Sequence, residues 1–281
     1  MKLAIAVGLS IFCAGAADLE QAQKLYSQTE FEQSLNVLAG LPVTDGTVLG
    51  LMGQDYFMLG EYKKATEVLE KAVAAQPFNS DWALWLGRAW GRRAETANPI
   101  SAMAQASKAR QNFEKAIQLN PRNTEALNDL LEYYLEAPGF LGGGIEKAKA
   151  VAVQIGALNS AEGHWAQAKI DEKRKELGSA EVQLRRAIEM APHQIGRMID
   201  LARFFARQGR YQESDQSFAR AEQISPESPK LMYARADVYI KTHRNLEVAR
   251  NLLERYLTAD ITPEDPPKSQ ARKLLRQAQG S

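Results

Sequence analysis

The stretch that decides the fold runs from residue 53 to residue 77 and reads GQDYFMLGEYKKATEVLEKAVAAQP. It contains two apolar segments with helical spacing, one ending near Leu59 and one running from Glu61 to Ala75, and Pro77 closes the second. Neither segment alone could bury its apolar face, so the pattern predicts two helices packed against each other. The pattern recurs along the chain with a period of about 34 residues, which is typical of stacked helix-turn-helix units.

This period divides the chain into a series of units followed by one last helix. The predicted units span residues 17–45, 46–79, 80–123, 124–160, 161–194, 195–228 and 229–263, and the capping helix spans 266–279. Surplus residues predict two lengthened turns, one around Thr96 to Gln105 and one from Gly139 to Gly144. No segment keeps the alternation of a strand, so we expect an all-α protein.

Small residues recur at the eighth position of the units, where they would let neighbouring helices approach closely. They are Gly53, Gly87, Ala168, Ala202 and Ala236. Larger apolar residues at other fixed positions would fill the remaining volume, and closing prolines would end second helices at Pro77, Pro121, Pro192 and Pro226.

Composition limits the classes of function that the chain can have. The 281 residues are 45% hydrophobic and 25% charged with a formal net charge of +1, as in ordinary soluble proteins. A helical repeat that binds RNA along a basic groove is conceivable, but the near-zero charge argues against a nucleic-acid partner.

The first residues have the pattern of a signal peptide. Lys2 precedes the apolar run from Leu3 to Cys13, and Ala14-Gly15-Ala16 follows with small residues where a signal peptidase cleaves. We expect cleavage after Ala16, which would leave one domain, 17–281, without cysteine or a transmembrane span. This predicts a bacterial protein that is exported to the periplasm or secreted; the alternative is a genuine N-terminal helix or anchor.

The residues at fixed positions resemble those of the tetratricopeptide repeat family over nearly all of the chain after residue 17. The units with Gly53 to Pro77 and Leu201 to Pro226 match closely, and the first unit matches poorly. The resemblance implies a right-handed superhelix, an α-solenoid of about seven units, whose first helices line a concave groove for proteins or peptides. The two lengthened turns resemble those of exported bacterial members.

The family's groove positions, carried onto this sequence, select a set of basic, polar and aromatic candidates. These are Arg88, Arg92, Asn128, Trp165, Lys169, Lys173, Arg203, Arg207, Tyr233 and Lys241. Such a mixture suits an acidic peptide or a C-terminal carboxylate. The alternative is a solvated face in which these cations pair with Glu162, Glu172 and Asp237.

A second hypothesis involves Trp82, Trp85 and Trp90, which lie close together in sequence before the lengthened turn. They could line a pocket for a small apolar or amphipathic ligand, because long turns in compact repeats are often functional. The alternative is that Trp85 and Trp90 pack in the core and that Trp82 is partly exposed.

The sequence offers no constellation for catalysis, so we expect neither an enzyme nor a cofactor. The histidines His164, His193 and His243 lack metal-ligand spacing, and all carboxylates are expected on solvated helix faces. The glycines from Gly139 to Gly144 could form an anion nest or a plain turn. Ile145-Glu146 follow where a phosphate-binding loop has Lys and Ser or Thr, which favours the turn. The predicted partner is an unidentified protein or peptide.

Overall fold

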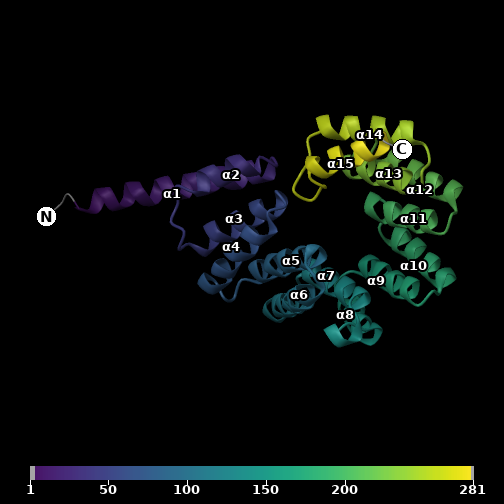
Figure 1. Cartoon of the computed structure of the whole chain (residues 1–281), viewed down its shortest axis with the longest axis horizontal. Helices are drawn as coiled ribbons and strands as arrows, with labels where there is room; N and C mark the ends of the chain where they lie inside the picture. Colours follow the sequence, from purple (N-terminus) through teal and green to yellow (C-terminus); the bar gives the residue numbers. More distant parts are fainter. Residues whose placement is uncertain (1–3, 280–281) are drawn as a thin grey trace. The chain divides into compact units, whose positions relative to one another are not determined.

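The computed structural model describes residues 4–279, with side chains from residue 16 onward. All regular structure in this range is helical, and the helices are labelled in chain order in Figure 1. The all-α prediction is therefore confirmed. Lys2 and the side chains of the apolar leader lie outside the described residues, whereas the backbone from Ala4 belongs to α1 (Ala4–Ser27). None of the described helices combines the length and apolar character needed to cross a membrane.

The chain forms two compact units, which divide near the end of α7. The first contains α1 with α2 (Phe31–Leu38), α3 (Gly46–Met58) with α4 (Tyr62–Ala75), α5 (Ser80–Thr96) with α6 (Pro99–Leu119), most of α7 (Thr124–Glu136), and the 3-10 helix η1 (Gly139–Leu141). The second contains α8 (Ile145–Leu158), α9 (Ser160–Lys173), α10 (Leu177–Met190), α11 (Ile195–Arg207), α12 (Tyr211–Ile224), α13 (Pro229–Lys241), α14 (Leu246–Thr258) and α15 (Lys268–Gln279).

Local sequence signals set the ends of these helices. Asparagine, aspartate or serine side chains accept backbone N–H groups at the starts of α3, α5, α6, α7, α9 and α13. Ser228 caps α13 and Pro229 follows it in the first helical position, and Asn79 caps α5. The second helices α4, α6, α10 and α12 each end two residues before a proline.

The small residues at the eighth position allow the two helices of a pair to approach closely. A Cβ atom at Gly53 would lie 2.4 Å from Leu69, and one at Gly87 would lie 2.6 Å from the Phe113 ring. The corresponding residues Ala168, Ala202 and Ala236 are fully buried. The expected role of these positions is confirmed.

The lengthened turn predicted from Thr96 to Gln105 is wrong. Helix α5 continues to Thr96 and α6 already begins at Pro99, so the surplus residues extend both helices. Asn98 accounts for this corner, because its side chain accepts the Ser101 N–H at 3.0 Å and Pro99 follows in the first helical position. The alanine-rich sequence after Pro99 then favours helix.

The glycine-rich segment between α7 and α8 forms an interhelical turn. Gly142 and Gly144 have φ values of 88° and 145°, which a residue with a side chain would adopt only under strain. The Tyr133 hydroxyl donates to the Leu141 carbonyl at 2.9 Å and fixes η1 to the end of α7.

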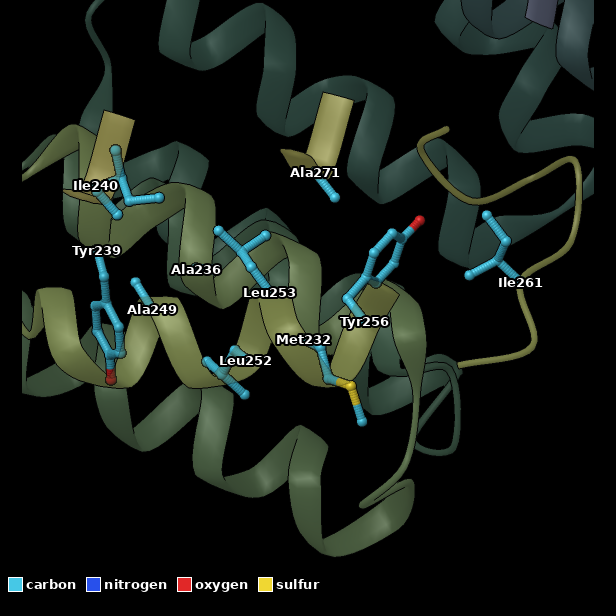
Figure 2. Packing of buried hydrophobic residues seen from close by; sticks show 11 residues of the cluster. Met232, Ala236, Tyr239, Ile240, Ala249, Leu252, Leu253, Tyr256, Ile261 and Ala271 are labelled. Atoms are coloured by element: carbon cyan, nitrogen blue, oxygen red, sulfur yellow. The ribbon is translucent and has the colours of Figure 1, made fainter. Parts of the chain in front are cut away.

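The last helix covers the end of the second unit. Ala271 and Ala278 of α15 are buried against α13 and α14, and Figure 2 shows Ala271 and Leu253 turned toward the same interior as Tyr256. The Tyr256 hydroxyl donates to the Pro266 carbonyl in the segment before α15. This segment and helix therefore close the apolar cluster.

Candidate functional site

The predicted groove residues lie on the first helices of their pairs. In the first unit, Arg88 and Arg92 lie on α5 and Asn128 on α7. In the second unit, α9 carries Trp165, Lys169 and Lys173, α11 carries Arg203 and Arg207, and α13 carries Tyr233 and Lys241. Helices α3 and α5 pack against each other, as do α11 and α13. Within each unit we call the surface formed by these residues the first-helix face.

Arg88 is held by acidic residues of the next first helix. Its guanidinium lies 2.6 Å from Asp129 and 2.9 Å from Glu125, and it covers the Trp85 ring at 5.0 Å. Burial lowers the pKa of Arg88, but Asp129 and Glu125 more than offset this and raise it overall. Burial also raises the pKa of Asp129, against the effect of Arg88. Arg88 therefore joins α5 to α7.

An aromatic cluster beside Arg88 and Arg92 was not predicted. The Phe57 ring makes edge contacts with Tyr62 at 5.4 Å and Trp85 at 5.3 Å, and Arg92 lies 5.3 Å from the centroid of the Tyr62 ring. Phe57 is the twelfth residue of the predicted unit 46–79, and the twelfth residue of each unit is one of the groove positions that the family resemblance implies. Applying the groove positions to the unit 46–79 as well would have identified Phe57 as a candidate.

The three tryptophans of α5 do not share one environment. The Trp82 indole donates to Gln76 at 2.7 Å, and its ring covers Gly50. Trp85 packs on Phe57, whereas Trp90 contacts the cations of Arg93 and Lys108, which lie 4.4 and 4.0 Å from its ring centroid. The hypothesis of a Trp-lined ligand pocket depended on a long turn after α5. The structure has only a short corner there.

Asn128 differs from the cations of this face in its hydrogen bonding. It is half-buried, and its side-chain oxygen is buried without a hydrogen-bond donor among the described residues. A buried amide oxygen normally has a partner, so Asn128 retains an unused capacity to accept a hydrogen bond.

In the second unit, Trp165 is buried beneath two cations. Lys169 and Arg197 lie 5.4 and 5.2 Å from the centroid of its ring. Arg197 also pairs with Glu162 and, at 2.9 Å, with Asp200. Sequence reasoning missed Arg197, although it lies one repeat length after Glu162, a spacing that places two residues on neighbouring first helices.

Predicted groove cations of the second unit also form ion pairs with carboxylates. Arg207 lies 2.6 Å from Glu172, Lys241 lies 2.8 Å from Asp237, and Lys173 lies 3.6 Å from Glu136. These contacts correspond to the alternative of an ion-paired, solvated face. Exposed pairs of this kind contribute little to stability, about 0 to 1 kcal/mol each.

Arg203 differs from these cations. It is half-buried on α11 and makes no ion pair or hydrogen bond with any residue that the structure describes. Arg203 acts electrostatically on Tyr233 of the adjacent α13. Burial and Asp237 raise the pKa of Tyr233, and Arg203 lowers it. Chemically, this arrangement offers an unneutralised guanidinium beside a partly buried aromatic ring, which can receive a carboxylate.

The expectation that every carboxylate lies on a solvated face is wrong for two residues. Asp55 and Asp171 are buried. Gln167 and Ser179 each donate to Asp171 at 2.6 Å, whereas neither oxygen of Asp55 has a hydrogen-bond donor among residues 16–279.

The described histidines and acids do not form a metal-binding group. In residues 16–279, no three His, Cys, Asp or Glu side chains gather in a way that could hold an ion. His164 contacts the Gln183 side chain at 2.6 Å, and His193 and His243 lie in turns.

Comparisons with known proteins agree with this helical architecture. The family model described as tetratricopeptide repeat matches residues 51–97, whereas the curated proteins yield no match. A tetratricopeptide repeat protein from Parabacteroides merdae has a TM-score of 0.60 and 14% identity, covering 94% of this chain and 98% of that chain. A thermophilic tetratricopeptide repeat protein from Thermus thermophilus has a TM-score of 0.56 and 21% identity, covering 68% and 98%.

A subunit of the APC/C hetero-tetramer Cut9-Hcn1 is also similar in structure, with a TM-score of 0.53 and 14% identity. The match covers 92% of this chain and 48% of that chain. At these identities, the three structures are informative about the fold alone. Repeat proteins of this kind are generally non-enzymatic scaffolds that bind protein partners along extended surfaces. Residues 51–97 are therefore identified as a tetratricopeptide repeat, and the series of packed helix pairs has the fold of tetratricopeptide repeat proteins.

Proposed function

We propose that this protein is a non-enzymatic adaptor that binds a protein or peptide segment bearing carboxylates on the first-helix face of its second unit. The observation that carries the proposal is Arg203, which lacks an acidic partner in the described chain and lies beside Tyr233. Its neighbour Arg207 is paired with Glu172. Arg203 is therefore the cation of α11 that an external acid can neutralise without first breaking an internal ion pair.

The partial burial of Arg203 would favour the binding of a ligand carboxylate. A half-buried guanidinium has lost part of its hydration, and a charge-assisted hydrogen bond from a ligand carboxylate would replace it. The Tyr233 ring adds an amphipathic contact of the type that often anchors protein interfaces. The exposed pairs around it would mainly set the rate and specificity of encounter, because surface charges act weakly on affinity.

We propose further that the protein acts outside the bacterial cytoplasm. The apolar run from Leu3 to Cys13 and the small residues Ala14-Gly15-Ala16 support a cleaved leader. Sequencing the N-terminus of the protein recovered from the cell envelope or medium should give Ala17 as the first residue. Recovery of a chain that still begins at Met1 would contradict cleavage.

The adaptor is tested by crosslinking a tagged copy in cells and comparing Arg203→Glu with Arg220→Glu. Both changes reverse one charge, but Arg220 is exposed on α12, a second helix. We expect the wild type and Arg220→Glu to enrich the same protein and Arg203→Glu to lose it. Equal enrichment by all three proteins, with unchanged circular dichroism, would contradict a role for Arg203.

The class of ligand is tested with fluorescent peptides. We expect peptides with Asp or Glu near a free C-terminus to bind more tightly than their Asn, Gln and amidated counterparts, with affinity falling as salt rises. Equal binding of charged and neutral peptides would exclude carboxylate recognition even if a protein partner is found.

A further inference from the structure

A carboxyl group is buried where the first two helix pairs meet. Asp55 of α3 is 0% exposed, and no described residue donates a hydrogen bond to either of its oxygens. Buried polar side chains are nearly always hydrogen-bonded, and an ionised carboxylate is especially costly to leave without a partner. Asp55 therefore favours its neutral form while the surrounding helices remain packed.

The groups around Asp55 do not supply a compensating positive charge. Burial raises the pKa of Asp55 to about 7, the proximity of the Ser34 hydroxyl of α2, which can act as a hydrogen-bond donor, lowers it, and the Glu32 carboxylate of α2 raises it. The contact between Ser34 and Asp55 lacks full hydrogen-bond geometry. The Ser34 hydroxyl donates to the Ala22 carbonyl of α1 at 3.1 Å. Ser34 thus has a competing acceptor in the same interface.

Tyr26 of α1 links this site to the neighbouring first helices. Burial and the Asp55 carboxylate raise the pKa of Tyr26, Arg88 of α5 lowers it, and Glu125 of α7 raises it. Arg88 is itself held by Glu125 and Asp129. Arg88, the cation that acts on Tyr26, is therefore already paired with carboxylates.

The helices that cover Asp55 also share an apolar cluster with α3. Ala22, Leu38 and Leu41 are buried with Val48 and Leu51 of α3, and partly buried hydrophobic residues pack around them: Leu19, Tyr26, Val37 and Met52. Undocking of α1 and α2 would hydrate Asp55 and expose the apolar side of α3, since these helices contact it directly. Ionisation of Asp55 does not have to outweigh this apolar contact, because it only changes the free-energy difference between the docked and the open state.

We propose that Asp55 is a protonation switch that controls the docking of α1 and α2 on α3. With Asp55 neutral, the pair is docked and the apolar surface around Val48 and Leu51 is covered. With Asp55 ionised, the pair opens more often, because the carboxylate gains water only in the open state. This device is independent of the adaptor proposed above, which uses residues of the second unit.

The direction of the pH dependence follows from proton linkage. The open state titrates near the ordinary value of 3.8, whereas the docked state titrates near the raised pKa of about 7. Between these values the docked state binds more protons. The opening equilibrium should therefore rise by up to about tenfold per pH unit and level off above pH 7.

The test is hydrogen–deuterium exchange of the full chain from pH 5 to pH 8, with intrinsic exchange rates corrected for pH. We expect the opening constant of α1 and α2 to rise at least tenfold from pH 5 to pH 7 in the wild type and to stay flat in Asp55→Asn. Helices α9 and α10 serve as the internal control, because the buried Asp171 there is hydrogen-bonded. A flat wild-type profile, or the same slope in the variant, would overturn the proposal.

A second measurement covers the case in which Asp55→Asn does not fold. Carbon-13 NMR of the aspartate carboxyl groups in the wild-type protein reports the titration of Asp55 directly. A midpoint above 6, with α1 and α2 amides shifting in the same range, supports the switch. A midpoint below 6 would overturn it.

Discussion

A pair of glycines on α5 tests whether close helix approach holds the repeat together. We compare Gly87→Ala with Gly91→Ala. A Cβ atom at Gly87 would lie 2.6 Å from the buried Phe113 ring and 3.2 Å from the Ala109 carbonyl, whereas one at Gly91 would have only the Ala109 methyl, at 4.0 Å. The two positions lie one turn apart on the same helix, so the chemical change is the same and only the space differs.

The environments of Gly87 and Gly91 predict how much each substitution changes the stability of the α5–α6 pair. Replacing an interior helical glycine by alanine stabilises a helix by about 0.5–1 kcal/mol, and this gain applies to both variants. Gly87→Ala adds overpacking, which typically costs about 1–3 kcal/mol because the buried ring must shift. The difference between the two variants therefore isolates the overpacking cost, and we expect about 1–3 kcal/mol in favour of Gly91→Ala.

Stacked repeats can unfold in stages, so we would measure the effect locally. Hydrogen–deuterium exchange of α5 and α6 gives the free energy of opening of this pair in each variant. Gly91→Ala should slow exchange slightly, whereas Gly87→Ala should accelerate it. Equal changes in the two variants would refute the argument that Gly87 is required by the approach of α6.

Three further predictions concern single contacts. Arg88→Ala should destabilise the junction of α5 and α7 by about 1–3 kcal/mol because Asp129 loses its cation, and adding Asp129→Asn should recover part of this loss in urea unfolding. Asn98→Ala should lower the free energy of unfolding by about 1 kcal/mol and speed amide hydrogen exchange in the first turn of α6. Asn98→Asp keeps a capping oxygen and should do neither. Equal exchange rates in the two variants would contradict the role of Asn98 as the cap. The hydrogen bond from Arg210 lowers the pKa of Glu181 below 4.5, so this contact stabilises the protein above that pH and is lost as the pH falls through the lowered value. Acid titration followed by circular dichroism should show that stability falls less steeply with pH in Arg210→Gln than in the wild type.

The fold was predictable from sequence because several signals agree at each helix pair. In the stretch from Gly53 to Pro77, the small residue, the helical spacing and the final proline all favour the same two helices. The corner between α5 and α6 was mispredicted because surplus length does not show whether it extends a turn or the helices beside it. The cap at Asn98 and the following proline were the signals that distinguish these outcomes.

The candidate site was less predictable. Repeat spacing could have identified the missed pair of Glu162 and Arg197, since residues about one repeat apart lie on neighbouring first helices. It does not show that Arg203 remains without an acid, because that depends on side-chain directions in three dimensions. The burial of Asp55 also escaped prediction, since its position alone does not show that α1 and α2 cover it.

The extended third pair shows which insertions this architecture tolerates. Helix α5 has 17 residues against 13 in α3, and α6 has 21 against 14 in α4. These differences of four and seven residues are close to one and two helical turns of about 3.6 residues each. The apolar stripe that contains Ala109, Phe113 and Ala116 therefore keeps its angular phase after the insertion. Insertions into this helix pair should therefore be tolerated in steps of whole helical turns. An insertion of five residues would rotate the apolar stripe of α6 away from α5.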